Sequence, residues 1–171
     1  LAQGHDDRVV EPWRAPKSVG AEETYEDDLL GEAAIRRTLL AHSQRIAGRL
    51  AAEGYRGRTV TVKLKFHDFK VQSRAITLPD AVADTTSIYE AAGALVDRFE
   101  LRHARVRLTG VSMGALESAA APRGLFVDPK LTKRQQLEAA VQAVAQRFGR
   151  SAIGRAALLP DDATSKDDRD E

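Results

Sequence analysis

The chain has 171 residues, with 26 Lys and Arg against 25 Asp and Glu, and 43% of its residues are hydrophobic. This length suits one domain with appended segments, and the absence of cysteine excludes disulfides, thiolate nucleophiles and cysteine metal sites. No apolar run reaches the roughly 18 residues of a membrane helix, and no signal-peptide layout is present, so we expect a soluble, cytoplasmic protein without a membrane partner. Leu1 in place of Met suggests a piece of a longer protein.

The net charge of +1 conceals a segregation of charge along the chain. Residues 1–30 carry a net −5, residues 31–110 a net +6, residues 111–154 a net +3 and residues 155–171 a net −3. The basic middle also contains the best strand patterns. We therefore expect the cationic surface to belong to the folded part of the protein and not to a tail.

The first third of the chain predicts a connector, a strand and a helix. Residues 5–16 carry acids and two prolines without a period, which is typical of an extended connector, and a strand of moderate quality follows at 17–26. Residues 31–53 fit a helix that stops at Gly54. Its apolar stripe is Ile35, Leu39, Ile46 and Leu50. His42 lies on the same stripe, and we interpret it as a core or boundary histidine.

Two strands, 58–67 and 69–78, are predicted next, with a tight turn near His67 and Asp68 and an end at Pro79. The first alternates strictly. Val60, Val62, Leu64 and Phe66 fall on one side, and Thr59, Thr61, Lys63 and Lys65 fall on the other. Such a strand buries one face and presents cations on the other. Nucleic-acid backbone is the commonest partner for a row of cations, and an ordinary solvated strand face is the alternative.

A second helix is predicted from a cap at Asp84, Thr85 or Thr86 to about Glu100. Its apolar stripe is Ile88, Ala92, Leu95 and Phe99. Residues 103–113 then predict a fourth strand. Its alternation places Val106 and Leu108 on one side and Arg105, Arg107 and Thr109 on the other.

This element order predicts an α+β fold, a two-layer split β-α-β-β-α-β sandwich with a four-stranded sheet and two helices on one face. The uncovered face of the sheet should be the cationic one. A C-terminal helix is expected from Thr132, with Thr132 and Gln135 as a capping box, to a stop at Gly149. It should bury Leu137, Val141, Val144 and Phe148. Residues 160–171 are acidic and polar, which predicts disorder.

The sequence does not indicate catalytic chemistry. It has no phosphate-binding glycine loop, no nucleophile elbow and no ligand-like spacing among its four histidines. Its acidic pairs lie in predicted loops or tails, whereas a two-metal nucleotidyl-transfer site needs carboxylates fixed on strands. We therefore expect no metal, no cofactor and no catalytic residue in this chain.

Three stretches in order resemble the little finger domain of Y-family DNA polymerases, in particular the bacterial DNA polymerase IV branch. They are KSVGAEETY at 17–25, VTVKLKFHDFKVQSRAITLP at 60–79 and VRLTGVSMGAL at 106–116. The resemblance implies that the uncovered sheet face grips template-primer duplex DNA by its phosphates in the major groove, beside the active site, and influences processivity and lesion bypass. The catalytic palm and its Mg²⁺ would belong to the polymerase core of the parent chain.

The resemblance also implies DNA-contacting residues. Lys63 and Lys65 match basic positions of the second strand, and Arg105 and Arg107 match those of the fourth. Ser73, Arg74 and Ala75 match a Thr-Arg-Ser contact on the third strand, with one hydroxyl lost at Ala75. Ser18 and Thr24 flank the first strand. Phosphate contacts position a duplex without reading its bases, as a polymerase that copies any sequence requires.

By the same resemblance, residues 1–16 are the end of the thumb and the tether, 17–117 the little finger and 131–159 a helical extension. Residues 118–130 are a linker in which Leu125 and Phe126 match the end of a Gln-Leu-x-Leu-Phe peptide that binds the sliding clamp; a linker that docks on the domain itself is the alternative.

Two other functions remain open at this stage. A protein-interaction module of ferredoxin-like form would use its basic face to bind an acidic protein partner. Single-stranded RNA binding would need exposed aromatic residues on the uncovered face. We expect none there, because Phe66 and Phe69 are interpreted as inward or turn residues.

Overall fold

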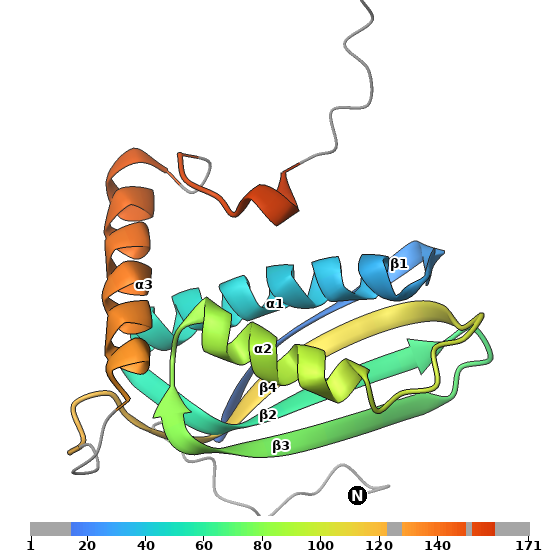
Figure 1. Ribbon diagram of the computed structural model, residues 1–171, viewed down its shortest axis with the longest axis horizontal. Coiled ribbons are helices and arrows are strands. Elements are labelled where there is room, and N and C mark those ends of the chain that lie inside the picture. Colours follow the sequence, from blue (N-terminus) through green and yellow to red (C-terminus); the bar gives the residue numbers. More distant parts are fainter. Residues whose placement is uncertain (1–14, 123–127, 150–151, 160–171) are drawn as a thin grey trace, which may run out of the picture.

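The computed structural model describes residues 15–122, 128–149 and 152–159, and it forms two layers (Figure 1). The elements in chain order are β1 (Ser18–Leu30), α1 (Glu32–Glu53), β2 (Tyr55–Phe66), β3 (Val71–Val82), α2 (Thr85–Val96), β4 (Arg105–Ser118), α3 (Pro129–Phe148) and a short 3₁₀ helix, η1 (Ala156–Leu158). The predicted strands and the first two helices are confirmed, with boundaries shifted by a few residues.

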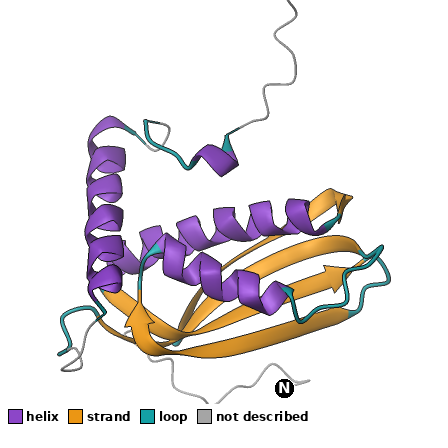
Figure 2. Ribbon diagram, in the orientation of Figure 1, coloured by secondary structure: helices purple, strands orange, loops and turns teal. Residues whose placement is uncertain are grey.

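The sheet has the strand order β1-β4-β2-β3, and every neighbouring pair is antiparallel. α1 joins β1 to β2, and α2 joins β3 to β4, but in each case another strand lies between the two that the helix connects. This is the split arrangement that the element order predicts. α1 and α2 lie on the same side of the sheet, and no described helix covers the other side (Figure 2).

The core lies between the sheet and these two helices. Val60, Val62 and Leu64 of β2 are fully buried, as the strict alternation of that strand predicts. The predicted stripes of α1 and α2 are buried as well, from Ile35 to Leu50 and from Ile88 to Phe99. Burial of one such aliphatic side chain stabilises the fold by about 1.5–3 kcal/mol, so this alternation fixes which face of the sheet points inward.

The ends of the two helices are set by local chemistry. α1 stops at Gly54, whose φ of 69° is the left-handed conformation that glycine adopts at little cost, and its N–H donates to the carbonyls of Leu50 and Ala51. α2 starts at Asp84, whose carboxylate accepts the N–H of Ser87 at 2.8 Å. Asp84 is therefore the cap among the three predicted candidates.

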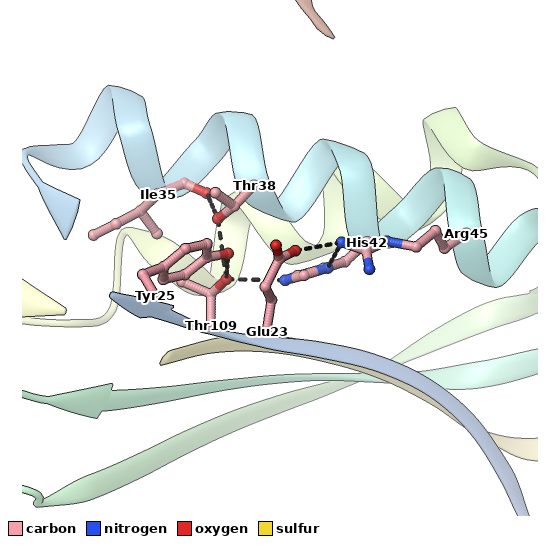
Figure 3. A network of polar contacts seen from close by, with 7 residues as sticks. All are labelled: Glu23, Tyr25, Ile35, Thr38, His42, Arg45 and Thr109. Atoms are coloured by element: carbon pink, nitrogen blue, oxygen red, sulfur yellow. Dashed lines mark hydrogen bonds and ion pairs between the residues drawn. The ribbon is translucent and has the colours of Figure 1, made fainter. Parts of the chain in front are cut away.

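A buried polar network joins α1 to the sheet (Figure 3). The Thr109 hydroxyl of β4 lies 2.9 Å from His42 Nε2, 3.0 Å from the Thr38 hydroxyl and 2.8 Å from the Tyr25 hydroxyl. Arg45 contacts His42 Nδ1 at 3.2 Å and the Glu23 carboxylate at 2.6 Å. His42 is fully buried, so it is a core histidine, as predicted.

The donors and acceptors of this network can be assigned completely. Arg45 can only donate, so His42 Nδ1 accepts and Nε2–H donates to Thr109. Thr38 donates to the carbonyl of Ile35, at 2.8 Å, and therefore accepts from Thr109. The Tyr25 hydroxyl then donates to Thr109. One hydroxyl on β4 thus binds side chains from α1 and β1, with the imidazole neutral.

α3 stands at one end of the helix layer (Figure 1) and docks through polar groups, contrary to the prediction. It begins at Pro129, capped by Asp128 and not by Thr132. Of the predicted stripe, Leu137 and Phe148 are 60% and 66% exposed, and Val141 and Val144 are half-buried. The one buried residue of α3 is Glu138, whose carboxylate accepts the backbone N–H of Thr85 at the start of α2, at 3.1 Å. A carboxylate at a helix N-terminus is favoured by unpaired N–H groups and by the helix dipole.

Further polar contacts hold this end of the chain. Arg134 donates to both carboxylate oxygens of Glu90 in α2, at 2.7 and 2.8 Å. Beyond α3, Arg155 donates to the Thr86 hydroxyl at 3.3 Å, and Arg37 of α1 donates to the carbonyl of Leu159. The prediction that α3 buries its apolar stripe fails for a physical reason. Hydrogen bonds of Glu138 and Arg134 with α2 determine which face of α3 packs against the domain.

The neutral His42 makes stability depend on pH. Burial, followed by the positive charge of Arg45, lowers the pKa of His42 from 6.5 to about 4. Between these values the unfolded chain binds a proton that the folded chain does not, so the free energy of unfolding should fall as pH drops from 6.5 to 4, by up to about 3 kcal/mol. Denaturant unfolding at several pH values measures this.

The matched variant is His42→Gln. The glutamine amide can still accept from Arg45 and donate to Thr109, but it does not titrate. We expect this variant to lose most of the pH dependence above pH 4. An equally steep decline in the variant would show that groups other than His42 cause it.

Candidate nucleic-acid interface

The uncovered side of the sheet, here called the open face, can be read from the strand register. Residues directly opposite each other in antiparallel strands point to the same side, and buried β2 residues mark the helix side. Four residues of each strand lie on the open face. They are Ser18, Gly20, Glu22 and Thr24 of β1; Leu108, Gly110, Ser112 and Gly114 of β4; Thr59, Thr61, Lys63 and Lys65 of β2; and Val71, Ser73, Ala75 and Thr77 of β3.

Most residues of this surface are glycine, serine or threonine, so few long side chains project from the sheet. Gly110 lies between Glu22 on β1 and Lys63 on β2, and a Cβ on it would come within 3.0 Å of the Glu22 Cβ. The missing side chain leaves a shallow hollow of about 280 Å³, which Gly20 and Ser112 also line. A flat surface with hydroxyl donors suits the close approach of an extended backbone.

The first predicted cation, Lys63, is on the open face but is already paired. Its ammonium lies 2.5 Å from the Glu22 carboxylate, and both side chains are about half exposed. Reasoning from the sequence missed Glu22, although it alternates with Ser18, Gly20 and Thr24 and so had to share their face. The open face is therefore less cationic than predicted.

The second cation, Lys65, belongs to a group at the other end of the strand. Its ammonium lies over the ring of Phe69, 4.8 Å from the ring centre, and the Arg107 guanidinium lies over the same ring at 5.3 Å. Neither cation has a carboxylate partner among the described residues. We call Lys65, Phe69 and Arg107 the Phe69 cluster.

β4 corrects the predicted alternation of its strand. Val106 pairs with Phe66 and Leu108 with Lys65, so the register shifts and Arg107 is an extra residue in the ladder. Leu108 consequently lies on the open face, and Thr109 lies fully buried on the helix side. The prediction that Val106 and Leu108 share one face, with Thr109 opposite, is wrong because a bulge reverses the parity of every later residue.

Arg105 is paired on the same irregular stretch. Its guanidinium lies 3.1 Å from the carboxylate of Asp28, in the part of β1 where the register with β4 breaks between Thr24 and Leu29. Of the two predicted fourth-strand cations, Arg107 joins the open face through the Phe69 cluster, and Arg105 is held by a carboxylate.

Arg74 is not on the open face, which corrects the prediction that it lines that surface with Lys63 and Arg107. It pairs with the buried Val62, and its guanidinium lies over the ring of Phe99, 4.9 Å from the ring centre. The reason is parity, because Arg74 alternates with Ile76 and Leu78, which pack against the core. Since β3 is an edge strand, Arg74 is still half exposed at the rim of the sheet.

The three predicted hydroxyl residues do lie on the open face. Ser18 is opposite Gly114, Thr24 is opposite Leu108, and Ser73 is opposite Lys63. Ala75, where the family pattern has a serine, is opposite Thr61. The predicted clamp contacts Leu125 and Phe126 lie outside the described residues, as does the predicted acidic tail at 160–171.

The aromatic prediction is wrong for Phe69. This residue is 62% exposed, and the open-face Lys65 lies over its ring. Its position in the turn between β2 and β3 was predicted, but no alternation extends into a turn, so its direction could not be read from the sequence.

Other kinds of site find no support in the part of the chain that the structure describes. No group of three or more His, Asp or Glu residues there could hold a metal ion. None of the described helices is long and apolar enough to cross a membrane. The described residues thus form a two-layer α+β domain, in which one side of the sheet carries hydroxyl groups, glycines and a few cations and is covered by no described helix.

Comparison with known proteins then identifies the family. Residues 16–125 match the model of the impB/mucB/samB family C-terminal domain, and the chain belongs to this family, as the little finger region of a Y-family DNA polymerase. The match includes all four strands of the sheet and both helices of the core.

Relatives with similar sequences are named DNA polymerases. The chain is 36% identical over 164 residues to "DNA polymerase IV" of Desulfatibacillum aliphaticivorans, covering 94% of this chain and 41% of the relative. It is 39% identical over 113 residues to "DNA polymerase IV" of Akkermansia muciniphila (66% and 32%), and 35% identical over 155 residues to "DNA polymerase IV 1" of Mesorhizobium japonicum (90% and 35%). The chain thus spans between about a third and two fifths of the length of these relatives.

Proposed function

We propose that this domain binds duplex template-primer DNA through its open face, by contacts to phosphates. The observation that carries the proposal is the open face itself, a sheet surface covered by no described helix, whose polar groups are cations and hydroxyls apart from Glu22, which is paired with Lys63. Lys65 and Arg107 supply unpaired positive charge, and Ser18, Thr24 and Ser73 supply hydroxyl donors. Such groups hold a duplex in position without reading its sequence.

The parent protein, in this proposal, is an error-prone translesion DNA polymerase of the polymerase IV kind that acts in DNA repair and replication in the cytoplasm. Its catalytic palm and Mg²⁺ belong to the polymerase core, outside the described residues. The domain would lie in the major groove and influence processivity and lesion bypass. The support for this is the family membership together with the names of the relatives.

Arg74 and Arg105 would make different contacts from Lys65 and Arg107. Arg74 is half exposed at the sheet edge on the helix side, so it reaches a phosphate only where the DNA backbone passes around the rim of β3. Arg105 must leave Asp28 to do so. The open-face cations should therefore contribute more affinity than these two.

The free cations give the first test. Lys65→Ala and Arg107→Ala should each weaken binding to random-sequence duplex about three- to tenfold near 0.1 M salt and reduce the log–log salt slope by about 0.9, because one phosphate contact is lost. Fluorescence anisotropy over a salt series measures both. Lys133→Ala, which removes an exposed lysine of α3, is the control and should change neither.

This assignment of the open face is wrong if both variants bind duplex with the affinity and salt slope of the unchanged protein. The alternative, a protein-interaction module, would be supported if the domain had no affinity for random-sequence duplex. It would instead bind an acidic protein, with an affinity that depends on a few side chains of that protein.

The Lys63–Glu22 pair gives a second test, in which affinity rises. Glu22→Gln frees the Lys63 ammonium, so duplex affinity should increase about three- to tenfold and the salt slope should steepen by about 0.9. Lys63→Ala should then cost little in the unchanged protein and more in the Glu22→Gln background. Glu53→Gln, the same charge change at the end of α1, is the control and should have a small effect. A Glu22→Gln variant with unchanged affinity would mean that Lys63 faces no phosphate.

The linker after β4 is proposed to bind a sliding clamp through Leu125 and Phe126. The first support is the match of these two residues to the clamp-binding peptide. The second is that the chain is held just before this segment, where Arg56 donates to the carbonyls of Ala121 and Pro122 at 3.0 and 3.2 Å. Phe126→Ala should abolish co-elution with the clamp and leave duplex affinity unchanged. Loss of duplex binding in that variant would instead indicate docking on the domain.

A further inference from the structure

The Phe69 cluster carries an inference that deepens the proposed function and rests on it. We infer that this cluster is a stacking site for an unpaired base next to the duplex, so that the domain binds a junction of double- and single-stranded DNA more tightly than a blunt duplex. The observations are the exposed ring, its strained backbone and the two cations over it.

The backbone of Phe69 is strained in a way that its neighbours enforce. Its φ is 64°, in the left-handed region that glycine or asparagine occupies at much lower cost than a bulky residue. The turn is fixed by the Phe69 N–H donating to the Phe66 carbonyl at 2.9 Å and by the Lys70 N–H donating to the Asp68 carboxylate at 3.1 Å. The His67 N–H also donates to the Arg105 carbonyl of β4, at 3.0 Å. The turn thus holds the ring in place.

Packing does not explain why a phenylalanine occupies this position. The side chain is 62% exposed, so it contributes little to the core, and its ring contacts two cations instead. Val71, next along the edge strand, is 56% exposed on the same face, and Leu108 lies two strands away. This end of the open face is therefore apolar, whereas the rest is rich in hydroxyl groups.

The two cations decide what kind of partner fits. Lys65 and Arg107 both lie over one ring, so they are no more than about 10 Å apart. An apolar protein surface covering Phe69 would have to desolvate both charges without a partner, which is costly. A nucleic-acid strand supplies a base for the ring and phosphates for the cations at the same time.

The base must be unpaired. Inside a duplex both faces of each base are covered by its neighbours in the stack, so away from the duplex ends a ring on a protein turn can contact a base face only where the strand is single. Stacking of this kind tolerates any sequence, since every base has an aromatic face. The duplex would lie over the hydroxyl-rich rows, with the single strand at the Phe69 end.

The test compares three DNA probes of the same random duplex: blunt, with a short 5′ overhang and with a short 3′ overhang. The chain as it stands should bind one overhang probe about tenfold more tightly than the blunt duplex, the size expected for one base–aromatic stack. Phe69→Gly should bind all three alike. Because glycine relieves the strain, this variant should keep or gain thermal stability, so the loss cannot be attributed to unfolding.

A second variant reports on contact directly. Phe69→Trp, made in a Trp13→Phe background so that it carries the only tryptophan, should keep the overhang preference, and its fluorescence should be quenched by the overhang probe and not by the blunt duplex. Phe148→Ala removes another exposed ring, 66% exposed on α3, and should leave the preference unchanged.

Equal binding of all three probes by the unchanged protein, or an overhang preference that persists in Phe69→Gly, would overturn the inference. Either result is distinguishable from failure of the proposed function. If only the stacking inference fails, blunt duplex should still bind and its affinity should still rise in Glu22→Gln. If the proposed function fails, blunt duplex binding and its response to Glu22→Gln should be lost as well.

Discussion

The pairing of β4 between β1 and β2 is the constraint on which both faces of the sheet depend. Thr109 must lie on the helix side, because its hydroxyl joins His42, Thr38 and Tyr25 in a network without a spare donor or acceptor. Gly110 and Leu108 are then forced onto the open face. Val106 is also needed in the core, and only an extra residue between Val106 and Leu108 allows both. Arg107 is that residue, so the bulge that completes the core also presents a cation.

The charges of the open face are unevenly distributed, which bears on how the proposed DNA contact would work. Glu22 forms an ion pair with Lys63, and Asp28 forms one with Arg105. The cations without a carboxylate partner among the described residues, Lys65 and Arg107, lie in the Phe69 cluster at one end of the open face. Hydroxyl groups in the remaining rows add short-range hydrogen bonds that weaken less with salt than charge pairs do. The proposed grip is thus weak per contact and uneven across the face.

The sequence predicted whatever depends on uninterrupted alternation. The two-layer fold, the buried stripes and the open-face position of Lys63 and Lys65 all follow from periods that hold over several residues. The position of Arg74 is also encoded in the alternation, because Ile76 and Leu78 share its parity and pack against the core, whereas the family motif alone suggests the open face. Leu108 and Thr109 could not be placed in this way, since a bulge leaves no mark in the alternation that precedes it. Phe69 lies in a turn, where no period applies.

α3 shows why a predicted apolar stripe can still fail to be buried. Packing Leu137 and Phe148 inward would bury apolar area, but it would leave the Thr85 N–H at the start of α2 without Glu138 and Glu90 without Arg134. An unmet buried N–H costs about 1–3 kcal/mol, comparable to what one buried aliphatic side chain contributes. The Glu138 contact therefore offsets part of what the stripe would contribute, and the more exposed contacts of Arg134 with Glu90 and of Arg155 with Thr86 fix the same orientation of α3. The choice is made by partners far away in the sequence, so no window within α3 itself could have revealed it.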